Sequence, residues 1–194
     1  MKVKLNLLKK NWLGENDMTS ILSRLLFIFI FLFSTYAHAC GNNNNAIVQG
    51  PFRDISFNEG YICFQSTSDK KDIEFYLGYE SPKGTQNHLI DTFYHSDAPV
   101  ELMSVFFVSV NKERNVAILL RWNVNYENNG IEYPYFYEIK TYRKSKEGKY
   151  ELNLSSETDD ALSGYQIIKN GKMQNYALDN AKKIKNYLID KYGA

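Results

Sequence analysis

A run of apolar residues near the amino terminus, residues 25–33, constrains this chain more than any other feature of its sequence. The run is too short to cross a bilayer as a helix, which needs about 20 apolar residues. Arg24 precedes it, and residues 37–39, Ala-His-Ala, follow it with the small side chains that signal peptidases accept. We therefore predict a secretory signal peptide over residues 1–39, which leaves residues 40–194 to build the fold.

The segment before the apolar run is interrupted by two acidic residues, Glu15 and Asp17. A more compact signal peptide begins at Met18, and we expect the true start there. Cleavage after Ala39 predicts a periplasmic location and a mature protein without a membrane span. The alternative is that the apolar run is not cleaved and serves as a membrane anchor.

The chain contains two cysteines, Cys40 and Cys63, and both follow the predicted signal peptide. An even number of cysteines in an oxidising compartment favours a disulfide between them. Cys40 also occupies the position of a lipoprotein cysteine, although residues 37–39 match the motif for lipidation poorly. Three alternatives stay open: the disulfide, a lipid on Cys40 that would make an outer-membrane lipoprotein, and two free thiols.

Charge and composition narrow the possible partners of the mature chain. Removal of residues 1–39 takes away five of the 23 basic and two of the 22 acidic side chains, which leaves a slight excess of negative charge. Nucleic-acid binding requires a concentrated positive field, so we expect no nucleic-acid partner. The sequence contains no glycine-rich phosphate loop, and we expect no cofactor. Residues 40–50 are predicted to be a flexible leader to a single domain over residues 51–194.

Alternation of apolar residues predicts a succession of short strands from residue 54 onward. Residues 105–108 and 117–120 are apolar at every position, which is typical of central strands that are covered on both faces. Asn170-Gly171 predicts a hairpin turn, and residues 178–192 have the spacing of an amphipathic helix. We predict an α+β fold, namely a mostly antiparallel β-sheet of about 6–9 strands with the C-terminal helix packed on one face. Ten segments have a strand-like pattern and are the candidates for these strands, namely residues 54–57, 61–66, 72–79, 89–94, 101–110, 116–124, 133–142, 149–154, 164–169 and 172–176.

Residues 106–120 place oxygen-bearing side chains at every second position between two apolar strands. The segment resembles the hairpin of FG-GAP-type repeats, in which such a loop binds calcium through alternating oxygens. The resemblance implies calcium ligands at Asn111, Glu113 and Asn115. A serine replaces the leading aspartate of that loop and an arginine replaces its glycine, so we expect a plain hairpin without a metal.

Groups that could carry catalysis are few. After removal of the signal peptide, His88 and His95 are the remaining histidines. Residues seven positions apart on a strand point to opposite faces, so these two imidazoles would not share a metal. The sequence also lacks the Gly-x-Ser-x-Gly motif of a nucleophile elbow. We expect no enzymatic activity, and the alternative is a hydrolase that uses His88 or His95.

Tyrosines are concentrated in one predicted strand, residues 133–142, where three of them alternate and are expected on one face. Tyrosine combines an apolar ring with a polar hydroxyl, which suits protein interfaces as well as half-buried sheets. A polar loop after residue 121 could present further side chains beside them. The predicted partner-binding residues are Arg121, Tyr126, Glu127, Tyr133, Tyr135 and Tyr137.

In its general character, a small exported chain without a catalytic set, the protein resembles the small exported immunity and inhibitor proteins of bacteria. The resemblance implies a protein partner, namely a bacterial toxin or a cell-wall-degrading effector that is neutralised by occlusion. The alternative is an envelope accessory protein or a small-ligand carrier, anchored through a lipid on Cys40. Such a carrier would need a cavity lined by phenylalanine and tyrosine side chains.

Overall fold

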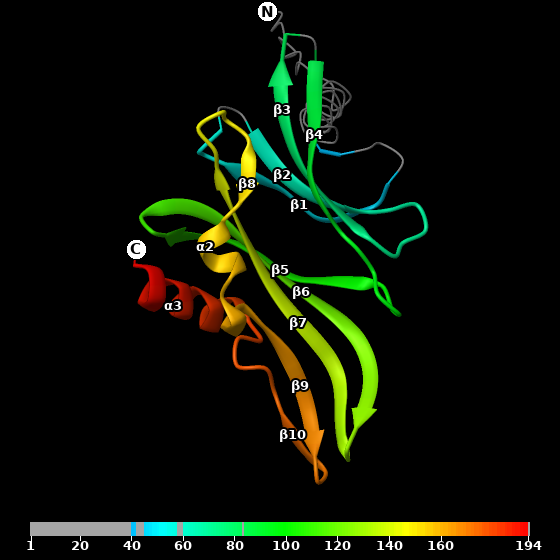
Figure 1. Cartoon of the computed structure of the whole chain (residues 1–194). Helices are drawn as coiled ribbons and strands as arrows, with labels where there is room; N and C mark the ends of the chain where they lie inside the picture. Colours follow the sequence, from blue (N-terminus) through cyan, green and yellow to red (C-terminus); the bar gives the residue numbers. More distant parts are fainter. Residues whose placement is uncertain (1–39, 42–44, 58–59, 83, 194) are drawn as a thin grey trace, which may run out of the picture. The chain divides into compact units, whose positions relative to one another are not determined.

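The computed structural model describes residues 40–41, 45–57, 60–82 and 84–193, so the predicted signal peptide lies outside the described residues. These residues form two antiparallel sheets and a C-terminal helix (Figure 1). Sheet A contains, in spatial order, β1 (Ile47–Asp54), β2 (Gly60–Ser66), β3 (Ile73–Ser81) and β4 (Gly84–Phe93). Sheet B has the order β10-β9-β7-β6-β5, and β8 also pairs with β7. Its strands are β5 (Val100–Val110), β6 (Glu113–Asn128), β7 (Ile131–Lys144), β8 (Tyr150–Leu152), β9 (Ser163–Lys169) and β10 (Lys172–Gln174). The helical segments are α2 (Leu154–Glu157), η1 (Asp160–Leu162) and α3 (Ala181–Tyr192).

Two sheets replace the single sheet that the sequence predicts. In sheet A each strand pairs with its neighbour along the chain, and this pairing stops between β4 and β5. β5 is an edge strand of sheet B, not the central strand that its apolar sequence predicts. Both of its faces are covered nevertheless, because Val105 and Phe107 pack toward sheet A while Val108 and Val110 pack toward α3. Burial on both faces explains the apolar sequence without a central place in the sheet.

Strand β6 separates two hydrophobic clusters. Val116, Ile118 and Leu120 belong to the cluster shared with sheet A, whereas Ala117 and Leu119 belong to the cluster under α3. Each of these side chains is at most 1% exposed. The prediction of a strand that is covered on both faces is confirmed for β6.

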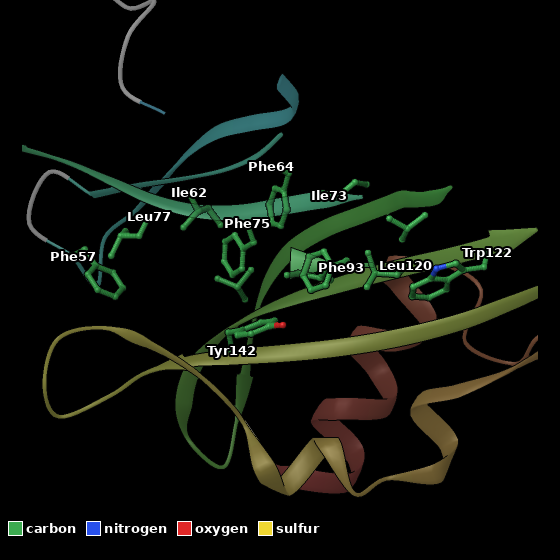
Figure 2. Packing of buried hydrophobic residues seen from close by; sticks show 13 residues of the cluster. Phe57, Ile62, Phe64, Ile73, Phe75, Leu77, Phe93, Leu120, Trp122 and Tyr142 are labelled. Carbon is green, nitrogen blue, oxygen red and sulfur yellow. The ribbon is translucent and has the colours of Figure 1, made fainter. Parts of the chain in front are cut away.

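The first cluster fills the space between the two sheets (Figure 2). The rings of Phe64 and Phe75 stack with their centroids 4.7 Å apart, and Tyr142 of β7 meets Phe75 edge-on at 5.3 Å. Phe57 lies at one end of the cluster and Trp122 at the other (Figure 2). Because aromatic rings bury the largest apolar areas in a core, we expect this stack to hold the sheets together.

Helix α3 covers the opposite face of sheet B. Ile184 and Leu188 are fully buried in the second cluster. Asn180 caps the helix by accepting a hydrogen bond from the backbone N–H of Lys183 at 3.1 Å, so the helix begins later than the sequence predicts. The prediction of a C-terminal amphipathic helix on one face of a sheet is confirmed.

Asp159, in the segment before β9, binds three side chains from the last turns of α3. Its carboxylate, 4% exposed, accepts hydrogen bonds from the hydroxyls of Tyr187 and Tyr192, each at 2.8 Å, and pairs with Lys191 Nζ at 2.7 Å. The backbone N–H of Ala161 donates a further bond at 3.2 Å. Burial alone would raise the pKa of Asp159, but the hydrogen bonds from Lys191, Tyr187 and Tyr192 outweigh it and lower the pKa to about 2.

The predicted disulfide is confirmed. Cys40 is bonded to Cys63 of β2, and the two Cα atoms are 5.9 Å apart. A lipid on Cys40 would need the same sulfur atom, so this disulfide and a lipidated Cys40 exclude each other. A disulfide-bonded fold fits an exported protein. In the described part of the chain, no helix combines the length and apolarity that a membrane span requires.

Hydrogen bonds also attach the segment around Cys40 to sheet A. Gln65 donates to the carbonyl of Cys40 at 3.3 Å, and Asn87 donates to the carbonyl of Gly41 at 2.6 Å. Strand β1 then begins at Ile47, within the stretch 40–50 that the sequence predicts to be a flexible leader. Most side chains of β1 are exposed or half-buried, so apolar alternation gives no signal for this edge strand.

Two local predictions near the end of the chain have different outcomes. The β9–β10 hairpin turns at Asn170 and Gly171, whose φ angles of 52° and 70° are the left-handed values that a tight hairpin needs, so this turn is confirmed. The predicted strand 149–154 is shortened to β8. Asn153 ends it by capping α2, because its side chain accepts a hydrogen bond from the N–H of Ser155 at 3.2 Å.

Candidate partner-binding surface

The predicted partner-binding tyrosines of β7 divide between the two faces of sheet B. The pairing register of β7 shifts between Tyr133 and Tyr135 on its β6 side, and a shift on its β9 side falls at the same place. Pro134 lies inside this irregularity and cannot donate a hydrogen bond to a neighbouring strand. Tyr135 and Tyr137 pack toward α3, whereas Tyr133 contacts rings on the other face of sheet B, which is directed toward sheet A. The prediction that the three tyrosines share one face is therefore wrong for Tyr133.

Five rings from β6, β7 and β9 form a continuous row on the face of sheet B that is directed toward sheet A. The members of this aromatic row are, in order, Trp122, Phe136, Tyr165, Tyr133 and Tyr126, with successive ring centroids 5.9, 4.9, 5.3 and 5.7 Å apart. Trp122 and Phe136 join the row to the first cluster. Trp122 is 9% exposed, but Tyr165 is 49% and Tyr126 is 55% exposed. The row thus leads from the core to the ends of β6, β7 and β9, which extend beyond the strands of sheet A (Figure 1).

Arg121 and the two remaining tyrosines form a separate group on the opposite face. The guanidinium carbon of Arg121 lies 4.4 Å from the ring centroid of Tyr135, and the side chain pairs with Glu101 at 2.5 Å. Tyr137 is 6% exposed and stacks on Tyr176 with centroids 5.4 Å apart. Burial would lower the pKa of Arg121, but hydrogen bonds with Glu101 and Tyr137 outweigh it and raise the pKa. Tyr137 therefore supports the second cluster and presents little surface to a partner.

The β6–β7 hairpin ends in an acidic tip. Glu127 lies directly opposite Glu132, and both side chains are exposed. Like charges at opposite positions of neighbouring strands destabilise a sheet. Among the described residues, neither carboxylate has a hydrogen bond or an ion pair. The tip therefore carries two negative charges that a basic group on another molecule would neutralise.

The two histidines occupy different places. His88 lies in β4 opposite Leu77, whereas His95 follows β4, and its Nδ1 is 2.6 Å from Asp72. The backbone N–H of His95 donates to the same carboxylate oxygen at 2.7 Å. Asp72 thus fixes the loop that follows β4 as well as the imidazole ring.

The residues of the FG-GAP-like segment are engaged with protein groups. Asn115 is fully buried; its amide donates to the carbonyl of Glu113 at 2.8 Å and its oxygen accepts from Asn153 at 2.9 Å. The Glu113 carboxylate pairs with Arg143 at 3.0 Å. Asn111 lies in the two-residue turn between β5 and β6, with φ of 53°. Within the described ranges, no group of three or more His, Cys, Asp or Glu side chains could hold a metal ion.

Three members of the aromatic row, Trp122, Phe136 and Tyr165, are absent from the sequence-based prediction. Trp122 and Phe136 are opposite each other in the β6–β7 pair, whose turn lies at Asn129-Gly130. Asn-Gly is a strong hairpin signal, and counting back from it would have placed Tyr126 opposite Tyr133. The sequence contains no comparable signal for Tyr165, because β9 reaches β7 only after β8, α2 and η1.

No protein-family model, curated protein or solved structure matches the chain. Its function must therefore be inferred from the chemistry of the aromatic row, the acidic tip and the disulfide.

Proposed function

We propose that the protein is an exported, periplasmic inhibitor of the immunity type, which binds a bacterial toxin or a cell-wall-degrading effector and blocks its active region. The aromatic row is the single observation that carries the proposal. Large aromatic side chains are normally buried, and an exposed group of them marks an interaction surface more often than an accident of packing. Inhibition by occlusion needs such an anchor and no catalytic residue in the inhibitor itself.

The row has the composition and order that strong protein interfaces use. Tyrosine and tryptophan are enriched among the residues that contribute most to binding. The rings already contact one another, so little side-chain freedom would be lost when a partner covers them. In the described part of the chain, the hydroxyls of Tyr126, Tyr133 and Tyr165 make no hydrogen bond, which leaves them available to a partner.

The acidic tip favours a partner whose contact surface is basic. Glu127 and Glu132 repel each other in the free protein, and a lysine or arginine of the partner would remove that repulsion. Charged groups at the rim of an interface act mainly on the association rate and are screened by salt. We therefore assign the affinity to the aromatic row and the salt dependence to the tip.

The carrier alternative gains no support from the core. The phenylalanine and tyrosine side chains that would line an internal cavity stack on one another instead, as Phe64, Phe75 and Tyr142 do. These three side chains are at most 2% exposed.

Co-purification tests the proposal. The full chain, expressed with its own signal segment and a C-terminal tag, is produced together with the product of the neighbouring open reading frame, and the periplasmic fraction is analysed by size exclusion. We expect a complex with one copy of each protein and loss of the neighbour's toxicity. Replacement of Tyr126, Tyr133 and Tyr165 by alanine should abolish the complex.

The matched control is Tyr79→Ala, which removes a tyrosine that is 41% exposed on β3, outside the aromatic row. This variant should form the complex like the unchanged protein. A complex that survives the triple replacement, or that is weakened equally by Tyr79→Ala, would contradict the assignment of the surface.

A further inference from the structure

A second candidate site lies at the junction of the two sheets. A pocket of about 350 Å³ opens between β3 and β4 of sheet A and the turn that joins β7 to β8. Its apolar lining consists of Phe57, Leu77 and Tyr79. Phe57 and Leu77 are 9% and 4% exposed and form the buried apolar floor of the pocket, whereas Tyr79 is 41% exposed and lies at the edge of the pocket. Pockets of this size accept small organic molecules.

The polar lining contains two lysines. Lys144, Lys149 and the imidazole of His88 surround the floor, and Glu147 is the acidic residue of the lining among the described residues. Lys144 is held in place, because its Nζ lies 4.7 Å from the ring centroid of Phe57 and donates a hydrogen bond to the carbonyl of Ser56. Across the described residues, the side chains of Lys149 and Glu147 take part in no ion pair. Two lysines thus face one carboxylate over an apolar floor.

We propose that this pocket binds a small organic carboxylate with an apolar body. The floor would bury the apolar body, and Lys149 together with Lys144 would hold the carboxylate at the rim. Lys144 is already ordered over Phe57, so it would attract the anion without a further loss of side-chain freedom. The excess of positive charge in the lining favours an anion over a neutral or cationic molecule of the same shape.

The pocket is independent of the proposed inhibitor surface. Phe57 and Leu77 lie at the opposite end of the first cluster from Trp122, where the aromatic row begins (Figure 2). Loss of partner binding and loss of carboxylate binding can therefore be measured separately, and neither result decides the other.

The test uses 3-phenylpropionate as the probe and 3-phenylpropanamide as its neutral counterpart. Binding is followed through amide shifts in nuclear magnetic resonance spectra of the exported protein. We expect saturable shifts near Leu77, His88 and Lys149 with the carboxylate, at a dissociation constant on the order of 1 mM, and several-fold weaker binding of the amide. No saturable shift, or equal binding of both probes, would overturn the proposal.

Three single replacements on one turn provide matched variants. Lys149→Met should weaken binding of 3-phenylpropionate by about fivefold, the size of one solvent-exposed charge pair. Glu147→Gln should strengthen binding, a gain that damage to the fold would not produce. Lys146→Met, on the same turn but outside this pocket, should leave binding unchanged. Equal losses for Lys149→Met and Lys146→Met would also contradict the site.

Discussion

The two ends of β6 in sheet B lie in different surroundings. Around residues 116–120, β6 is buried on one face by sheet A and on the other by α3. Between Trp122 and Tyr126 the same strand passes beyond sheet A and α3, and its rings contact other rings of the aromatic row. The difference shows that one pair of long strands can supply a rigid core at one end and an accessible aromatic surface at the other. Substitutions at the covered end should change stability, and those at the uncovered end should change binding.

The largest effect is expected for Ile118→Ala at the covered end. Ile118 is fully buried between the sheets, and truncation of such a side chain costs about 2–5 kcal/mol in free energy of unfolding because it leaves a cavity. Urea unfolding measures this loss. Ile118→Val, which removes a single methyl group, should cost about 1 kcal/mol and serves as the matched control. A loss for Ile118→Ala no larger than that for Tyr126→Ala would remove the contrast between the ends.

Breaking the Cys40–Cys63 disulfide should have the next largest effect. The bond closes a loop with a sequence separation of 23 residues, and a cross-link of that span contributes about 3 kcal/mol. The urea midpoint should fall when a reductant is added, and a variant with serine at both positions should show the same lower midpoint without reductant. Because the bond lies on sheet A, binding through the aromatic row should persist at low urea. An unchanged midpoint would show that the cross-link contributes nothing.

Asp159→Asn should cost about 1–3 kcal/mol at neutral pH, because Lys191 loses its charged partner and the amide offers one acceptor oxygen where the carboxylate offers two. The pKa of Asp159 is lowered from 3.8 to about 2 in the folded protein, so its stabilising effect is fully present above pH 4 and is lost as the pH falls toward 2. The gap in unfolding free energy between the two proteins should close over that range. Asp160→Asn, an exposed neighbour, is the control, and a gap that does not depend on pH would contradict the assigned titration.

The smallest effect on stability is expected for Tyr126→Ala at the uncovered end. Tyr126 is 55% exposed, and among the aromatic rings of the described residues it contacts Tyr133 alone, so its loss should change the free energy of unfolding by no more than about 0.5 kcal/mol. If the aromatic row binds the partner, the same replacement should weaken the complex by at least about tenfold. Urea unfolding of the free protein measures the change in stability, and size exclusion of the complex measures the loss of binding. Stable folding with undiminished binding would remove Tyr126 from the interface.

Local patterns predict the elements of this fold better than their arrangement. The turn at Asn170-Gly171, the amphipathic α3 and the doubly covered β6 follow from short-range spacing, and all three are present. Alternation reports which residues share a face, but it does not report which strands pair. The division into two sheets depends on a break in pairing between β4 and β5, for which the sequence has no local signal.

The candidate surface shows the same limit. Alternation places Tyr133 with Tyr135, and the register shift around Pro134 reverses that assignment. Tyr165 enters the aromatic row through pairing of β9 with β7, a long-range contact that spacing alone does not reveal. The hydrogen bonds to Asp159 likewise come from Tyr187 and Tyr192 of α3, which are distant from it in sequence, so local spacing does not predict them.

The position of β6 between the two clusters has a consequence for how the molecule unfolds. Its even-numbered side chains from 116 to 120 support one cluster and its odd-numbered side chains support the other, so the strand cannot leave one cluster without exposing the second. Sheet A packs against one face of this strand and α3 packs against the other. We therefore expect sheet A and α3 to unfold together in a single cooperative transition. Amide hydrogens of residues 116–120 should then exchange with solvent only when the whole domain opens, which makes them reporters of global unfolding.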